Sequence, residues 1–310
     1  MGPETLTASV VVPTWRRAAW LDDCLRALGG QPIAPADVLV VGRRDDDAAQ
    51  DVVRLWKRRG RFPIRWLEVE GPGHVAPVRR GLEAADADVV AFLDDDAEAD
   101  PGWLAALVRP FEDERVACVG GRVVTPGFRG TVHRDAGRLR TYGKYVGNVG
   151  ALESRVAVEV DAVMEGNCAW RTAVLRGLRF DPVLDFGDAS MYGLDLCLQA
   201  RERGFLIVYE PRARVLHHAA PRDGSLDRSD RAPRTFAYSR NYTYIALKHL
   251  RGLRRATFVA WWWLVGERGS HGLLKAGADL ILRGRTGARE IAASFAGKRE
   301  GLRAWRAALP

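Results

Sequence analysis

The feature that most constrains the fold is the alternation of short apolar runs with amphipathic segments over residues 8–93. Four apolar runs have the length and aliphatic content of buried strands: 8–13, 37–42, 64–69 and 88–93. Three segments with apolar residues at helical spacing separate them: 18–28, 48–59 and 74–86. Strands and helices that alternate in this way form right-handed βαβ units. The sequence therefore predicts an α/β fold with a mostly parallel sheet and helices on both faces.

The pattern changes after about residue 115. We expect further strands at 116–124, 156–164 and 205–209, a helix at 194–203, and a loop over 217–234. From residue 235 the spacing of apolar residues favours helices to the end of the sequence. This organisation predicts two domains, over 1–234 and 235–310.

Charge is distributed unevenly along the 310 residues. The whole sequence has a formal net charge of +8, but residues 231–310 hold 16 basic and 4 acidic residues, a net charge of +12. A basic, Trp-rich segment over 241–310 is typical of contact with an anionic membrane surface, and the alternative is packing of these helices on the catalytic domain. Nucleic acid is not expected as a partner, because the sequence contains no known binding module.

Cysteine spacing and hydropathy indicate the compartment. The four cysteines are far apart and form no C-x-x-C pair, which favours a reducing cytosol over a disulfide scaffold or a structural zinc site. The N-terminal residues lack the pattern of a signal peptide. The longest apolar run has 11 residues, fewer than the ~20 that a membrane-spanning helix needs. We therefore expect a cytoplasmic protein, peripheral on the inner face of the cytoplasmic membrane.

Three consecutive carboxylates follow the fourth apolar run. Asp94, Asp95 and Asp96 lie where a parallel strand ends, which is where α/β sheets bind ligands. Clustered carboxylates repel one another unless a cation lies between them, and oxygen ligands at this spacing suit Mg²⁺ or Mn²⁺. The alternative is an acidic loop that caps the helix expected near residue 102, but the strand before the cluster favours the metal.

Four segments in this order resemble the family 2 glycosyltransferases, which have the GT-A fold. They are SVVVPTWRRAAWLDDCLRAL, GHVAPVRRGLEAADADVVAFLDDDAEADPGWL, EGNCAWRTAVLRGLRFDPVL and LDLCLQARERGF, and the resemblance covers roughly residues 8–250. It implies a nucleotide-diphosphate-sugar donor and a divalent metal, Mn²⁺ or Mg²⁺. By match to the D-x-D motif, Asp96 is the main metal ligand and Asp94 contacts the metal or the ribose.

Other roles follow from the same resemblance. His217 matches a third metal ligand, although a His pair in a loop is more often structural. Arg79 matches an arginine beside the phosphates, unless it lies on a solvated helix face. The implied donor-binding residues are Pro13, Thr14, Arg43, Asp45, Arg79, Asp94, Asp95 and Asn167. Asn167 could also be a turn residue or reach the acceptor.

Two departures from the family pattern matter. After the second apolar run the family has an Asp-Asp pair that holds the nucleobase, and Gly42 and Arg43 stand there instead. Asp45 is then a candidate for the base contact, or Arg43 and Arg44 for phosphate. This leaves the nucleotide open.

The second departure concerns the catalytic base. Gly193 occupies the usual position of a carboxylate that takes the proton of the acceptor hydroxyl in an inverting transfer. Asp185, Asp188 and Asp195 are nearby, and we favour Asp188 or Asp195 without separating them. For Asp195 the alternative role is a carboxylate stabilised at a helix N-terminus.

Together these features predict a metal-dependent, inverting glycosyltransferase. The acceptor would be a glycan or a polyprenyl-linked precursor in cell-envelope polysaccharide synthesis. The alternatives are a non-catalytic or weakly active nucleotide-sugar-binding protein, and a GT-A nucleotidyltransferase.

Overall fold

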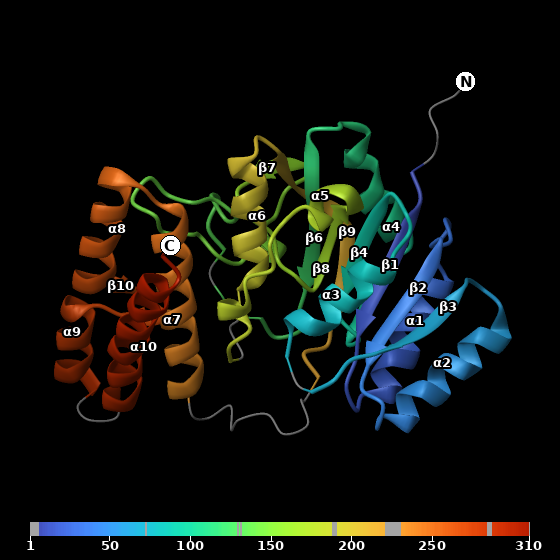
Figure 1. Ribbon diagram of the computed structural model, residues 1–310, viewed down its shortest axis with the longest axis horizontal. Helices are drawn as coiled ribbons and strands as arrows, with labels where there is room; N and C mark the ends of the chain where they lie inside the picture. Colours follow the sequence, from blue (N-terminus) through green and yellow to red (C-terminus); the bar gives the residue numbers. More distant parts are fainter. Residues whose placement is uncertain are drawn as a thin grey trace. The chain divides into compact units, whose positions relative to one another are not determined.

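A computed structural model describes residues 6–71, 73–128, 130, 132–187, 191–220, 231–283 and 287–309 (Figure 1). The chain divides into two compact units. The sheet unit consists of Met1–Arg138, Val146–Phe180 and Leu196–Asp223. The helical unit consists of Leu139–Tyr145, Asp181–Asp195 and Gly224–Pro310. The predicted domain boundary after residue 234 stays a prediction.

One central sheet forms the sheet unit. Its strands, among the described residues, are β1 (Ala8–Pro13), β2 (Asp37–Gly42), β3 (Ile64–Glu68), β4 (Val89–Leu93), β5 (Ala97–Ala99), β6 (Val116–Val124), β7 (Val158–Val160), β8 (Asn167–Arg171) and β9 (Leu206–His217). The order is β3-β2-β1-β4-β8-β6-β9-β5, and β7 pairs with β9. The first four strands in this order run parallel, as do β6 and β9, whereas β8, β5 and β7 pair antiparallel. The mostly parallel α/β sheet is the predicted one.

The helices of the first 202 residues are α1 (Ala18–Gly29), α2 (Asp47–Arg59), α3 (Val75–Ala84), α4 (Trp103–Val108), α5 (Thr172–Arg176) and α6 (Tyr192–Glu202). Three short 3₁₀ segments are described with them: η1 (Arg109–Glu112), η2 (Val149–Ala151) and η3 (Pro182–Leu184). The strands and helices expected before residue 94 are all present. The strand expected at 156–164 is shorter, and the one expected at 205–209 is longer. The sequence pattern did not predict β5 or β8.

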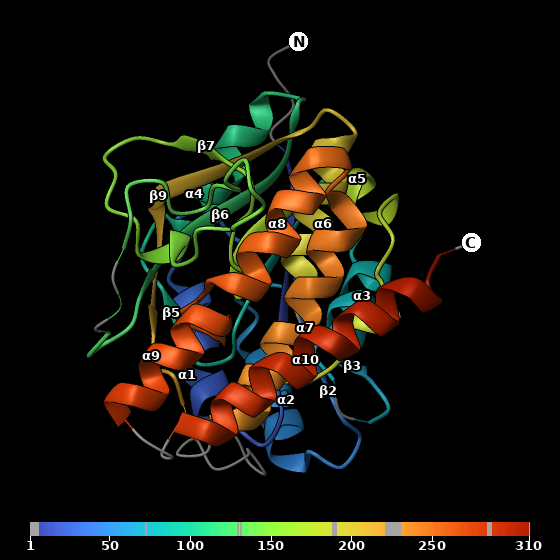
Figure 2. The ribbon, with the colours of Figure 1, turned by 90° about the vertical axis from the view of Figure 1, so that its left-hand side faces the viewer.

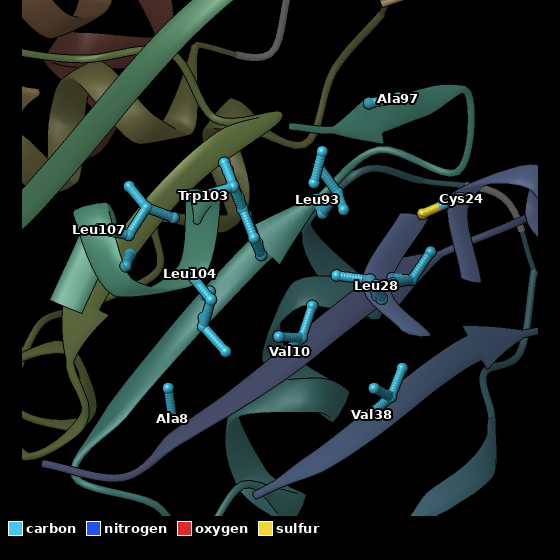
Figure 3. Packing of buried hydrophobic residues seen from close by; sticks show 14 of the residues in the cluster. Ala8, Val10, Cys24, Leu28, Val38, Leu93, Ala97, Trp103, Leu104 and Leu107 are labelled. Carbon is cyan, nitrogen blue, oxygen red and sulfur yellow. The ribbon is translucent and has the colours of Figure 1, made fainter. Parts of the chain in front are cut away.

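Successive side chains of a strand point to opposite faces of the sheet, and β1 shows how both faces are covered. Val10 and Val12 belong to a buried cluster with residues of α1 and α2, such as Leu28 and Trp56; Figure 3 shows part of this packing. Val11 points to the other face, where α3 lies so close that a Cβ on Gly81 would be 2.4 Å from Val11 Cγ1. Helices therefore cover both faces, as predicted.

The helical unit contains the predicted C-terminal helices. They are α7 (Ala232–His249), α8 (Gly252–Leu264), α9 (Leu273–Arg283) and α10 (Ala288–Ala307), and a two-stranded turn, β10 (Gly266–Glu267) and β11 (Ser270–His271), follows α8 (Figure 2). Helix α10 approaches α7 closely at two glycines. A Cβ on Gly297 would lie 2.4 Å from Phe236 O, and a Cβ on Gly301 would lie 2.3 Å from Arg240 O.

An aromatic cluster fills the interior of the helical unit. Trp262 is fully buried against Tyr242 and Phe258, and its Nε1 donates to Thr243 Oγ1 at 2.8 Å. The neighbouring tryptophans, at 261 and 263, are half-buried. The consecutive tryptophans thus contribute to packing. Among the described residues, none of the helices combines the length and the apolarity that crossing a membrane requires.

Candidate functional site

The acidic loop after β4 is the chemical centre of the sheet unit. Asp94 follows Leu93 at the carboxyl end of a central parallel strand, where sheets of this kind bind ligands. The loop leads directly into β5, which pairs antiparallel with β9 so that Ala97 lies opposite His217. This pairing, which the sequence did not reveal, brings a histidine from far along the chain to the carboxylates.

Asp94, Asp96 and His217 form a cluster of suitable size for one metal ion. One ligand atom from each lies within 4.8 Å of the others. His217 Nε2 is 3.3 Å from Asp96 Oδ1 and 3.9 Å from Asp94 Oδ2. Asp94 is half exposed, whereas Asp96 is buried. The cluster is therefore anchored on one side and open on the other, which leaves room for oxygen ligands from a substrate.

The charges in this cluster compensate one another. Burial raises the pKa of Asp96, but the hydrogen bond and the positive charge of His217, together with the hydrogen bond from Ala220 N, outweigh it and bring the pKa to about 2. In turn, the hydrogen bond to Asp96 raises the pKa of His217 against the effect of burial. The Asp96 carboxylate therefore stays ionised and favours a positive charge beside it, which a proton on His217 or a metal ion can supply.

Gly166 leaves the space that Asp94 needs. A Cβ at this position would lie 2.1 Å from Asp94 Oδ2 and 2.6 Å from its Cγ. The backbone also fixes the loop, because Asp94 N donates to Gly166 O at 3.2 Å. Two carboxylates and one imidazole are a ligand set that suits Mn²⁺, and Mg²⁺ also favours carboxylate oxygens. The donor set and the space that Gly166 leaves beside it thus fit the expected divalent ion.

Asp95 is turned into the protein and holds two loops together. Its carboxylate accepts hydrogen bonds from Thr14 Oγ1 at 2.7 Å and from Arg17 Nη1 at 2.8 Å. Burial raises the pKa of Asp95 to about 6, although the charge of Arg17 and the hydrogen bond of Thr14 oppose this. We expected Asp95 and Thr14 to bind the donor; the structure places their side chains against each other, and a contact with the donor stays a prediction.

Arg17 is a site residue that the sequence reasoning missed. Besides Asp95, its guanidinium lies 3.3 Å from Asp96 Oδ2, and its Nη2 donates to Ala220 O at 2.9 Å. It therefore balances the charge of two of the three carboxylates and ties the segment after β9 to the acidic loop. The only available signal was its place four residues after the end of β1.

The loop after β2 lies where the family has its base-binding Asp-Asp pair, and here it contains Arg43 and Asp45. The Arg43 guanidinium lies 3.9 Å from the ring centre of Trp15, and Asp45 is exposed. The neighbouring Asp46 is buried and caps α2 by accepting from Ala49 N at 3.3 Å, and it also accepts from Arg16 N at 2.6 Å. Asp46 thus shapes this loop, which the sequence reasoning did not foresee. Nothing in these contacts decides between Arg43 and Asp45 as nucleotide ligands.

Three other predicted donor residues have different surroundings. Asn167 is fully buried: its Oδ1 accepts from Trp103 Nε1 at 2.8 Å, and its Nδ2 donates to Arg122 O and Ala213 O at 3.0 and 3.1 Å. This amide joins strands, so the structure gives it a packing role. Arg79 lies on the exposed face of α3, 3.9 Å from Glu83. Pro13 is the last residue of β1 and is half-buried.

The two candidate bases differ in what the structure shows. Asp188 lies outside the described residues. Asp195 belongs to the helical unit, is 1% exposed, and accepts from Lys248 Nζ at 2.8 Å and His249 Nε2 at 2.7 Å. Lys248 also donates to Asp181, at 2.9 Å. A general base must meet the hydroxyl whose proton it takes, so this buried and paired carboxylate is placed for a structural role.

Comparison with known proteins identifies the chain. Residues 9–164 match the family model described as glycosyl transferase family 2, which is half of the chain. The chain belongs to this family. The chain is 29% identical over 222 residues to pre-mycofactocin glycosyltransferase of Mycobacterium tuberculosis. This match covers 70% of the chain and 43% of that protein.

Two other relatives match over shorter segments. Validoxylamine A glucosyltransferase of Streptomyces hygroscopicus subsp. limoneus is 38% identical over 104 residues, or 32% of the chain and 22% of that protein. Glycosyltransferase AglE of Haloferax volcanii is 29% identical over 117 residues, or 37% of the chain and 38% of that protein. The chain thus spans less than half the length of each of these relatives.

Solved structures share the fold at low sequence identity. TarS 1–349 of S. aureus in complex with UDP-GlcNAc aligns with a TM-score of 0.62 at 16% identity, covering 93% of the chain and 79% of that structure. The mannosyltransferase PcManGT of Pyrobaculum calidifontis, in complex with GDP-Man and Mn²⁺, aligns with a TM-score of 0.59 at 19% identity, covering 97% and 88%. The predicted GT-A fold is confirmed.

Proposed function

We propose that this protein is a metal-dependent, inverting glycosyltransferase. It would move a sugar from a nucleotide-diphosphate donor to a glycan or polyprenyl-linked acceptor in cell-envelope polysaccharide synthesis. The observation that carries the proposal is the meeting of Asp94, Asp96 and His217 at the carboxyl end of β4 in a chain of glycosyl transferase family 2. The solved relatives support it, because TarS is in complex with UDP-GlcNAc, and PcManGT with GDP-Man and Mn²⁺.

The residues of the cluster would have distinct tasks. Asp94, Asp96 and His217 would hold the divalent ion, which when bound supplies positive charge to the leaving diphosphate. Arg17 and the Ala220 N–H hold Asp96 Oδ2, which would leave Oδ1 to bind the ion. Arg43 and Arg79 would meet the phosphates or the base from the surrounding loops.

Inversion needs one further carboxylate on the acceptor side. Asp195 is held by Lys248 and His249 in the described arrangement, which leaves Asp188 as the proposed base. Asp188 would take the proton of the acceptor hydroxyl as the sugar carbon is attacked from the face opposite the diphosphate.

The acceptor and the location are part of the same proposal. A polyprenyl-linked acceptor lies at a membrane, and the net charge of +12 over residues 231–310 would attract the protein to an anionic surface. We therefore place the protein in the cytoplasm, peripheral on the inner face of the cytoplasmic membrane.

Product analysis tests the activity. The protein is incubated with UDP-, GDP- and dTDP-sugars and Mn²⁺, and the products are separated by chromatography. The proposal predicts release of a nucleoside diphosphate from one donor, loss of release on chelation, and recovery with added Mn²⁺ or Mg²⁺. Release of pyrophosphate would identify a nucleotidyltransferase instead.

A second candidate function has one observation in its favour. Gly193 occupies the usual base position, and Asp195 nearby is buried and paired. A non-catalytic nucleotide-sugar-binding protein would have this arrangement. It would show a donor-dependent thermal shift with no nucleotide release from any donor, whatever acceptor is added.

A further inference from the structure

Helix α9 has its apolar side chains outside. All its exposed residues with a described side chain are uncharged: Leu273, Leu274, Gly277, Ala278, Leu280, Ile281 and Leu282. Three of them are among the most exposed large hydrophobic side chains described in the chain, with Ile281 at 85%, Leu282 at 79% and Leu274 at 68%. A surface helix of a globular protein normally turns its apolar stripe toward the core. Helix α9 instead exposes its large apolar residues to solvent.

Polar contacts hold α9 in this orientation. Lys275 Nζ donates to Glu267 O at 2.6 Å, and the Asp279 carboxylate pairs with His271 Nε2 at 2.8 Å. Both partners belong to the turn between α8 and α9, and His271 is buried. Lys275 and Asp279 therefore fix the helix to its own unit, and its large apolar residues stay exposed.

Helix α8, its neighbour, extends the apolar surface. Leu253 is 79% exposed, Leu264 is 50% exposed, and Val265 just after the helix is 44% exposed. Figure 2 shows α8 and α9 within the helical unit. We call the exposed residues of these two helices the α8–α9 face. Isolated apolar residues on a surface need no explanation, but several large ones on two successive helices indicate a binding surface.

The exposed charges of the C-terminal helices and of the turn between α8 and α9 have a single sign in the described residues. Over 231–282 and 287–309, every exposed charged side chain is an arginine: Arg231, Arg234, Arg251, Arg254, Arg268, Arg289, Arg299, Arg303 and Arg306. The acidic residues in these ranges, Glu267, Asp279, Glu290 and Glu300, are all half-buried. The C-terminal segment that carries the apolar face therefore has only positive exposed charges in these ranges.

We propose that the α8–α9 face docks on an anionic phospholipid bilayer, with α9 lying in the interface and its leucines and Ile281 among the acyl chains. A helix with a strong apolar face and a positively charged surround is typical of interfacial anchors. The 11 residues of α9 extend for only about 16 Å, too short to cross a hydrocarbon core of about 30 Å. The helix therefore lies on the membrane surface.

Charge complementarity decides between a membrane and a second copy of the chain. A two-fold dimer presents the same patch from both subunits. The C-terminal helices, over residues 231–282 and 287–309, offer such a dimer exposed arginines and no exposed acidic partners, whereas phosphatidylglycerol supplies the opposite charge. This inference deepens the proposed function, on which it rests for the membrane-bound acceptor, but lipid docking itself requires no metal, donor or transfer.

Vesicle sedimentation tests the docking. The full chain is mixed with vesicles of phosphatidylcholine alone or of phosphatidylcholine with phosphatidylglycerol, and the bound fraction is measured. Wild type should bind the anionic vesicles, bind neutral vesicles at least about tenfold less, and be released by high salt. Equal binding to both vesicles, or no binding to either, would overturn the proposal.

Two substitutions define the surface. The double variant Ile281→Ser with Leu282→Ser should reduce binding to anionic vesicles at least about tenfold. The reason is that two apolar side chains, which move from water to the acyl chains on binding, are replaced by polar ones. Ile33→Ser is the matched control, since Ile33 is 53% exposed in the sheet unit, and it should bind as wild type does. Unchanged binding of the double variant refutes the assignment of this face.

Two further readouts separate lipid docking from misfolding of the variant and from dimerisation. All changed residues are exposed, so the melting temperature of the double variant should match that of wild type. Release of nucleotide from the donor, measured with a soluble acceptor, should also be unchanged. If light scattering instead shows a wild-type dimer that the double variant dissociates, with no vesicle binding, the face is a contact between copies and the lipid proposal is wrong. Absence of nucleotide release with intact vesicle binding would refute the proposed activity alone.

Discussion

Gly166→Ala tests the metal cluster by steric displacement alone. A Cβ on residue 166 would lie 2.1 Å from Asp94 Oδ2, 2.6 Å from its Cγ and 2.9 Å from its Oδ1. Contacts below 3.0 Å essentially never occur for real Cβ atoms, so something must shift. The three nearest atoms all belong to the half-exposed Asp94 side chain, which has room to rotate. We expect Asp94 to turn to another rotamer and leave the cluster.

The size of the effect follows from this displacement. Gly166 has no left-handed backbone angle, so alanine adds no backbone strain, and the free energy of unfolding should change by less than about 1 kcal/mol. Misplacing a metal ligand or its support typically costs about 10–100-fold in metal affinity or activity. That range corresponds to about 1.4–2.7 kcal/mol of binding free energy.

The assay combines a calorimetric Mn²⁺ titration, nucleotide release and a melting curve. Gly147→Ala is the matched control, because a Cβ at residue 147 would meet no atom within 4 Å, and it should behave as wild type in all three. If Gly166→Ala bound Mn²⁺ as tightly as wild type and released nucleotide at the same rate, Asp94 would not be a metal ligand and the reasoning would be wrong.

Three further predictions concern single side chains. Asp195→Asn should lower the free energy of unfolding by about 2 kcal/mol, measured by urea denaturation, because the neutral amide no longer pairs with Lys248, which keeps only Asp181 as a charged partner; an unchanged midpoint would contradict the structural role. Asp188→Asn should instead lower kcat with little change in donor affinity or melting temperature, and wild-type turnover would exclude it as the base. Burial lowers the pKa of Lys298 to about 7 from 10.5, so the folded state releases a proton that the unfolded state keeps. Stability should therefore rise with pH between these values, by up to about 1.4 kcal/mol per pH unit, and Lys298→Met should flatten this rise in denaturation midpoints measured across the range.

The sequence predicts the first half of the sheet well, for a physical reason. Buried parallel strands are continuous apolar runs, and β1, β2 and β4 stand out from the polar segments around them. Strand β8 was not predicted because its five residues, Asn167–Arg171, contain a buried amide and a terminal arginine. Its position is set by pairing with β4 and β6, which are distant in sequence.

The candidate site was partly predictable for a similar reason. The place of Asp94, Asp95 and Asp96 after β4 indicated a metal site, and the resemblance to family 2 selected Asp94 and Asp96 and added His217. Arg17 could not be found, because its role depends on contacts with Asp96 and Ala220 that only the folded chain creates.

The basic C-terminal segment, residues 231–310, shows a different limit of prediction from sequence. The sequence drew attention to three consecutive tryptophans, but Trp262 is fully buried and its two neighbours are half-buried. The exposed apolar residues are those of α9, such as Ile281. Amphipathic spacing gives the two faces of a helix but not which of them points outward; here the buried pairing of His271 with Asp279 decides it.

The central claim is that Asp94, Asp96 and His217 hold a divalent ion that binds the donor diphosphate. The most direct test is a calorimetric Mn²⁺ titration of wild type and Asp96→Asn, with and without a nucleoside diphosphate. Asparagine keeps an oxygen to accept from Ala220 N, so the loop should stay folded. We predict one Mn²⁺ site in wild type, with a higher Mn²⁺ affinity when the diphosphate is present. The Mn²⁺ affinity of the variant should be at least about tenfold lower. Equal Mn²⁺ affinity in the two proteins, or diphosphate binding that is indifferent to the metal, would contradict it.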